Sequence, residues 1–261
     1  MKRQKEDSYR RPKSKWNKQI VIIIIVILLI ISVIMFMNWL IEDEGSWMPN
    51  YPKAELEELA LKENLTNEDY DTILMQTGLG REATDILLRS QNSDELIQTL
   101  EQYQDDFFSY GDYECRVQAV IVHEKRISGE NGQPVKGFEI LDIKNGDIFI
   151  TKATHSLGWQ HGHAAIVTDA SEGETLEAIH LGESIIFQNV EKWKTYPSFI
   201  QLRLQDYDSV EAMKIAEYAK KELLGLPYGL LTGIPQKAPD KLKRTQCSHL
   251  VWYPYNRFGY D

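Results

Sequence analysis

Two segments of the chain carry residue types suited to nucleophilic chemistry. Cys247 opens the apolar run Leu250-Val251-Trp252, which predicts a thiol at the N-terminus of an amphipathic helix. Unpaired backbone N–H groups and the helix dipole stabilise a thiolate at such a position. His163 begins an apolar segment well upstream and is a candidate for the base that activates the thiol.

Each of these residues also has another interpretation. A disulfide between Cys115 and Cys247, the two cysteines of the chain, is one alternative. His161 rivals His163 as the base, because residues two apart on an extended segment share a face. His155, His161, His163 and Cys247 could be metal ligands, but the chain has neither a Cys-x-x-Cys nor a His-x-x-x-His pair. We therefore expect no metal and no organic cofactor.

Acyl transfer by a thiol also needs a group that orients the base and donors that hold the oxyanion. Glu177 lies inside an apolar strand pattern and could accept a hydrogen bond from the imidazole, although an outward-facing surface glutamate fits the same pattern. Tyr228 follows the helix-ending residues Gly225 and Pro227, so its hydroxyl could project toward the oxyanion, or the ring could simply pack. Ser248 is the second ancillary candidate.

The pattern beyond residue 113 predicts short strands and two helices. Period-two runs and turn residues indicate one strand over residues 117–123, a turn at 129–132 and a tight turn at 145–147 that precedes a strand at 148–151. Further strands are expected at 164–168, 176–179, 185–188 and 199–204. Helices are expected at 208–224 and from Cys247 to about residue 256. These patterns predict a small antiparallel sheet and two helices.

A helical segment is expected at residues 54–112, where leucines and isoleucines recur at spacings of three and four. Thr66 and Asp69 form a plausible helix cap, and the glycines at 78 and 80 separate two helices. We interpret this segment as a packing or spacer element.

The N-terminal region has the features of a membrane anchor. Residues 20–37 are apolar except for Ser32, which is long enough to cross a hydrocarbon core of about 30 Å. A buried core helix and a cleaved signal peptide are the alternatives, but no small-x-small cleavage pattern follows the run. We expect a basic tail at 1–19, a transmembrane helix at 20–41, a linker at 42–53, the helical segment at 54–112 and a catalytic domain at 113–261. Trp16 and Trp39 bracket the apolar run 20–37 as interfacial anchors would.

The charge of the chain is unevenly distributed. Residues 1–19 carry eight basic and two acidic residues, a charge of +6, whereas the whole chain has −10, so the remainder carries −16. This acidic bulk argues against a nucleic-acid partner. The basic tail instead predicts a cytoplasmic N-terminus and an extracytoplasmic remainder, and would also attract anionic lipid heads.

Five short blocks in the second half of the chain occur in a specific order. They are Gly-Asp-Ile at 146–148, Gly-His-Ala-Ala-Ile-Val at 162–167, Leu-Glu-Ala at 176–178, Leu-Gly-Leu-Pro-Tyr at 224–228 and Gln-Cys-Ser-His-Leu-Val-Trp at 246–252. Together they resemble the circularly permuted papain-like amidases, the YiiX-type branch of the NlpC superfamily, in which the histidine precedes the cysteine. The resemblance covers roughly residues 140–261. The chain departs from the family pattern at His249, where an acidic residue is expected. It also ends at Asp261, earlier than similar proteins, so a fragment and a shortened rim of the cleft are both alternatives.

The resemblance implies a papain-like α+β fold, in which the small antiparallel sheet packs on the helix of the nucleophile. It also implies a Cys247, His163 and Glu177 site with Tyr228 as an ancillary group. The pattern of a glycine directly before the histidine favours His163 over His161 as the base. The implied activity is cleavage of an amide or related acyl bond by a cysteine hydrolase, an amidase, endopeptidase or acyltransferase. Expected substrates are cell-wall peptides, which suit a bacterial surface, or acyl groups of lipids or lipoproteins. The alternative is a non-catalytic, membrane-tethered binding module of the same fold.

Overall fold

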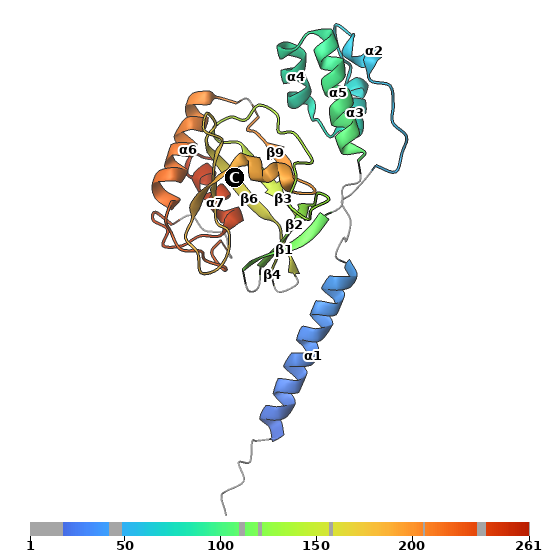
Figure 1. Cartoon of the computed structure of the whole chain (residues 1–261). Coiled ribbons are helices and arrows are strands. Elements are labelled where there is room, and N and C mark those ends of the chain that lie inside the picture. The colour runs from blue at the N-terminus through green and yellow to red at the C-terminus, as the bar shows by residue number, and fades with distance from the viewer. Residues whose placement is uncertain are drawn as a thin grey trace, which may run out of the picture. The chain divides into compact units, whose positions relative to one another are not determined.

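The computed structural model describes residues 18–41, 49–109, 113–119, 122–156, 159–205, 207–233 and 239–260, without the side chains of 37–41, 113–119 and 159. The chain forms two units, residues 1–42 and 43–261 (Figure 1). Most of the expected basic tail and of the 42–53 linker lies outside the described residues, as does Trp16.

Helix α1 (Lys18–Ile41) is the described part of the first unit. Its 24 residues correspond to about 36 Å, and its side chains from Lys18 to Phe36 are all exposed. No polar face interrupts the apolar surface, so water is a poor solvent for it. The helix is long and apolar enough to cross a membrane, and a signal sequence has the same properties.

Four helices form the N-terminal part of the second unit: α2 (Glu57–Ala60), α3 (Asn67–Thr77), α4 (Arg81–Ser90) and α5 (Ser93–Phe107). The predicted cap is confirmed, because the Thr66 side chain accepts from the backbone N–H of Asp69 while the Asp69 carboxylate accepts from that of Thr66. Gly78 ends α3 at φ 75°, a left-handed conformation that glycine adopts at little cost. Leucines and an isoleucine form the common core of these helices.

A four-stranded sheet follows, with the order β1-β2-β4-β5. Its strands are β1 (Tyr113–Ala119), β2 (Val122–Ile127), β4 (Thr154–Ser156) and β5 (Trp159–Gln160). The prediction of a single strand over 117–123 is wrong, because Val117 pairs with His123 across an antiparallel hairpin between β1 and β2. Residues 120 and 121, between the two strands, lie outside the described part of the chain.

The second sheet is antiparallel, with five strands in the order β8-β7-β6-β3-β9. It contains β3 (Ile148–Thr151), β6 (His163–Asp169), β7 (Glu174–Glu177), β8 (Ile186–Asn189) and β9 (Ile200–Leu202). All five were predicted; the bounds of β3 agree, and those of the other four differ by one or two residues. A 3-10 helix, η1 (Val190–Thr195), connects β8 to β9 and was not predicted.

Helices α6 (Ser209–Leu223) and α7 (Cys247–Arg257) both contact β6 and each other. In Figure 1 they lie together beside the five-stranded sheet. Their buried side chains share one apolar core with β6 and β7, in which Ile166, Leu176, Ile215 and Leu250 are fully buried. The predicted α+β architecture, with an antiparallel sheet packed on the helix that Cys247 begins, is confirmed at this level.

Candidate active site

Cys247 is the first residue of α7, as the sequence predicts. Gln246 is the N-cap, and its side-chain oxygen accepts from the backbone N–H of Ser248 at 3.1 Å and faces the Cys247 Sγ at 3.6 Å. The cysteine is a free thiol in a buried position, so it is not part of a disulfide. The side chain of Cys115 lies outside the described residues.

His163 is the first residue of β6, and a tight approach of two strands fixes its position. It pairs with Thr151 of β3. The preceding Gly162 has φ 75°, and a Cβ added there would come within 2.5 Å of the Thr151 carbonyl oxygen. Only glycine fits this combination of conformation and space. The glycine therefore places the imidazole at the end of the sheet.

The Cys247 thiol and the His163 imidazole are close enough for each to shift the pKa of the other. Burial raises the pKa of Cys247, but the hydrogen bond and charge of His163, together with the backbone N–H groups of Ala164 and Ser248, lower it below its ordinary value. Burial alone would lower the pKa of His163, yet its bonds to Cys247 and Glu177 raise it to about 9. Opposite shifts of this kind favour a thiolate–imidazolium pair at neutral pH.

Glu177 ends β7 and is completely buried. It lies opposite Ala165 of β6, so the two side chains are on the same face of the sheet. His163 is two residues before Ala165 on β6, and its side chain therefore shares that face. Its Oε2 accepts from His163 Nε2 at 2.7 Å. Because that nitrogen is occupied, Nδ1 is the ring atom left for the thiol.

Three further donors hold the Glu177 carboxylate. Lys192 Nζ donates to the same Oε2 at 2.8 Å, whereas Trp193 Nε1 and Thr175 Oγ1 donate to Oε1 at 3.1 and 2.9 Å. Burial would raise the pKa of Glu177, but the charges of Lys192 and His163 and their hydrogen bonds lower it well below its ordinary range. The carboxylate is thus ionised and fixed in orientation, which a buried charge requires.

Lys192 and Trp193 are site residues that the sequence did not reveal. Both lie on η1, and the Trp193 ring stacks on the imidazole of His163 with centroids 5.7 Å apart and planes 11° apart. The one sequence signal for these residues is the adjacent pair Lys192-Trp193 shortly after the strand Ile186–Asn189. It does not predict contact with Glu177, because that contact depends on the return of the chain after β8.

A second buried ion pair supports η1 from the four-stranded sheet. Arg126 of β2 donates to the Lys192 carbonyl and to Thr195 Oγ1, both at 2.8 Å, and pairs with Glu124. The guanidinium lies 3.6 Å from the centre of the Tyr196 ring, whose hydroxyl donates to Glu124. These contacts hold the turn that carries Lys192 against the site.

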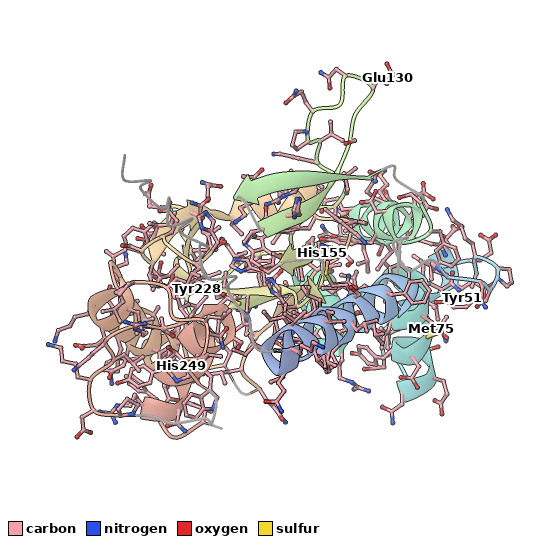
Figure 2. All side chains as sticks on the ribbon, turned by 90° about the horizontal axis from the view of Figure 1, so that it is seen from below. Tyr51, Met75, Glu130, His155, Tyr228 and His249 are labelled. Atoms are coloured by element: carbon pink, nitrogen blue, oxygen red, sulfur yellow. The ribbon has the colours of Figure 1, made fainter. Side chains whose placement is uncertain are left out.

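The two ancillary candidates occupy different environments. Tyr228 is partly buried, and burial together with the nearby Cys247 raises its pKa to about 12, so its hydroxyl keeps its proton at neutral pH. Ser248 is exposed, and its hydroxyl accepts from Gln246 Nε2 at 2.8 Å. Figure 2 labels Tyr228 together with His249, a buried residue whose Nδ1 lies 3.0 Å from Thr245 Oγ1.

The other histidines near the site have different partners. His161 Nε2 bonds to Ser156 Oγ and its Nδ1 lies near the Gly162 carbonyl oxygen, both at 2.7 Å, so the ring is not directed to Glu177. Burial lowers the pKa of His161. His155 is buried on β4 (Figure 2). Among the residues that the structure describes, no three His, Cys, Asp or Glu residues form a group that could hold a metal ion.

Comparisons with known proteins found no match: no protein-family model, no curated protein and no solved structure matches the chain. What the chain can do therefore follows from its own geometry. A thiol at a helix N-terminus, near an imidazole that a buried carboxylate orients, is an arrangement able to perform nucleophilic acyl transfer.

Proposed function

We propose that this chain is a membrane-anchored thiol hydrolase of the circularly permuted papain-like class, which cleaves an amide or related acyl bond. The observation that carries the proposal is the series Cys247, His163 and Glu177, in which the imidazole bonds to Glu177 and shifts the pKa of the nearby Cys247. The order in the chain, histidine before cysteine, supports the permuted class, as does the packing of α7 on an antiparallel sheet.

In the proposed reaction, the Cys247 thiolate attacks the carbonyl carbon of the substrate and the carbonyl oxygen takes up the displaced electron pair. His163 then gives its Nδ1 proton to the leaving amine or alcohol as the tetrahedral intermediate collapses to a thioester. Water attacks this thioester while His163 accepts one of its protons, and the thiolate leaves with release of the acid. Glu177 stays ionised and stabilises the imidazolium whenever it forms.

Two groups are suited to stabilise the oxyanion. The backbone N–H of Cys247 is in the first turn of α7, where helical N–H groups have no intrahelical acceptor. The Tyr228 hydroxyl is protonated at neutral pH and lies within the electrostatic influence of Cys247. We assign these two groups to the oxyanion and give Ser248 a supporting role through its backbone, since its N–H lowers the pKa of Cys247.

The anchor and the substrates complete the proposal. In this proposal helix α1 spans the membrane, the basic residues 1–19 lie in the cytoplasm and the thiol lies outside; the apolar length of α1 and the charge of the tail support it. The acidic remainder of the chain suits neither nucleic acid nor a polyanionic substrate. Cell-wall peptides and the acyl groups of lipids or lipoproteins are the substrate classes within reach of such an anchor.

A trapped thioester tests this function. The detergent-solubilised full chain is incubated with muropeptides or with acyl lipids, quenched in acid, and digested for mass spectrometry of the Cys247 peptide. We expect an acyl adduct on Cys247 that hydroxylamine removes and that His163→Ala prevents. Ser248→Ala is the matched control and should still form the adduct. Absence of an adduct with both substrate classes, in a chain whose thiol still alkylates, contradicts the proposal.

A further inference from the structure

Exposed leucines gather on two loops beside the thiol. Leu181 lies in the loop between β7 and β8, and Leu224, Leu230 and Leu231 lie in the segment after α6. Leu181 is 54% exposed, Leu230 59% and Leu231 73%, the highest value among the large apolar side chains that the structure describes. Isolated exposed leucines are common, but a contiguous group marks a contact surface. We refer to these four residues as the leucine rim.

Backbone hydrogen bonds make the two loops one surface. The N–H of Ile185 donates to the Leu226 carbonyl at 2.8 Å, and the N–H of Tyr228 donates to the Glu183 carbonyl at 2.9 Å. Tyr228 in turn pairs with Thr245, two residues before the nucleophile. The leucine rim therefore lies on two loops that meet beside Tyr228 and the segment that leads to Cys247.

Basic side chains accompany the rim in a unit that is otherwise acidic. Lys241, Lys243 and Arg244 are exposed, and the aliphatic part of Arg244 lies so close to Gly229 that a Cβ added there would come within 2.6 Å of it. Two carboxylates lie in the same region: Glu183 in the first loop, and Asp240, which is 3.5 Å from Arg257. The cations outnumber these carboxylates, so the local charge is positive.

We propose that the leucine rim and the adjacent Lys241, Lys243 and Arg244 dock the entrance of the thiol site onto an anionic lipid bilayer. Leucines enter the boundary between head groups and acyl chains, while lysine and arginine contact the lipid phosphates. Exposed apolar side chains flanked by cations have the composition of a bilayer-contacting surface, whereas an apolar patch for a protein partner needs no such positive border. Only the purpose of the docking rests on the proposed function, because the binding of this surface to a bilayer does not require that the site turn over a substrate.

Lipid quenching tests the docking with the full chain in nanodiscs. In a Cys115→Ser, Cys247→Ser background, Leu231→Cys is labelled with an environment-sensitive fluorophore, and lipids with a nitroxide near the head group are added. Met75→Cys, a similarly exposed apolar position on α3, is the control (Figure 2). In nanodiscs of phosphatidylcholine with one quarter phosphatidylglycerol, we expect at least about threefold stronger quenching at position 231 than at 75.

Charge reversals distinguish docking on anionic lipid from quenching that arises only because the fluorophore is near the bilayer. Each lysine at an anionic surface strengthens binding by about fivefold, so Lys241→Glu with Lys243→Glu should remove at least half of the quenching. The control pair Lys62→Glu with Lys214→Glu, two exposed lysines outside the leucine rim and its loops, should leave it unchanged. Equal quenching at positions 231 and 75, equal quenching in neutral and anionic nanodiscs, or no effect of the first pair overturns the proposal. Because Cys247 is absent from these variants, failure here is distinct from failure of the proposed hydrolase.

Discussion

Replacement of Glu177 by glutamine removes the charge that holds His163 protonated. The His163 Nε2 is 2.7 Å from Glu177 Oε2, and both groups are buried. Two charges about 4 Å apart interact by about 4 kcal/mol at an effective dielectric constant of about 20, and 1.36 kcal/mol corresponds to roughly one pH unit. Glutamine keeps a hydrogen-bond acceptor, so we expect the His163 pKa to fall from about 9 by roughly two to three pH units.

The assay is a pH titration of the histidine rings by NMR in the full chain labelled with ¹³C-histidine, with the His163 signal assigned through His163→Ala. The same variant should react more slowly with iodoacetamide at pH 6, because a less stable imidazolium no longer lowers the pKa of Cys247. The two readouts are independent, since one follows the base and the other the nucleophile.

Lys192→Met provides a control of opposite sign. Its ammonium donates to the same Glu177 oxygen as His163 does, at 2.8 Å, and therefore repels the imidazolium. Its removal should raise the His163 pKa above about 9. If Glu177→Gln leaves that pKa near 9, or if both variants shift it in the same direction, the assignment of Glu177 as the group that stabilises the imidazolium is refuted.

Three other predictions concern stability. Gly162→Ala should lower the free energy of unfolding in urea by at least about 2 kcal/mol and slow the alkylation of Cys247, because the added Cβ would meet the Thr151 carbonyl oxygen. Gly182→Ala, also at positive φ but with nothing within 4 Å, should lower the free energy of unfolding by less. Equal losses in the two variants would contradict this reason. Asn92→Ala removes the side-chain cap of α5 and should cost about 1 kcal/mol, with no change in Cys247 reactivity. Since the pKa of Glu177 is lowered in the folded state, its stabilising effect is present above about pH 4.5 and is lost as the pH falls below it; thermal unfolding should show a shallower acid decline in Glu177→Gln, and identical profiles would argue against an ionised Glu177.

The sequence was a good guide where local rules decide the structure. Helix α7 begins at Cys247, as the apolar run after it predicts, and the tight turn at 145–147 precedes β3 as predicted. Both features follow from backbone geometry within a few residues. The Thr66 cap of α3 is of the same kind, which is why it could be predicted from four letters.

Features that depend on the return of the chain were not predictable. The β1–β2 hairpin was mistaken for one strand because residues 119–122 are Ala-Val-Ile-Val, which contain none of the usual turn residues. Lys192 and Trp193 lie on a 3-10 helix whose contact with Glu177 is set by the path between β8 and β9. Sequence periodicity carries no information about such pairings, so His163 could be predicted as a partner of Glu177 but Lys192 and Trp193 could not.

The most direct test of the central claim is the rate of alkylation of Cys247 against pH, in the full chain and in its His163→Ala variant. Free cysteines have a pKa near 8.5, and histidine-paired catalytic thiols fall to roughly 3.5–7.5. The account predicts fast alkylation below pH 7 that His163→Ala abolishes and His161→Ala does not. A thiol that titrates like a free cysteine, or that ignores the loss of His163, would contradict a catalytic pair at this site.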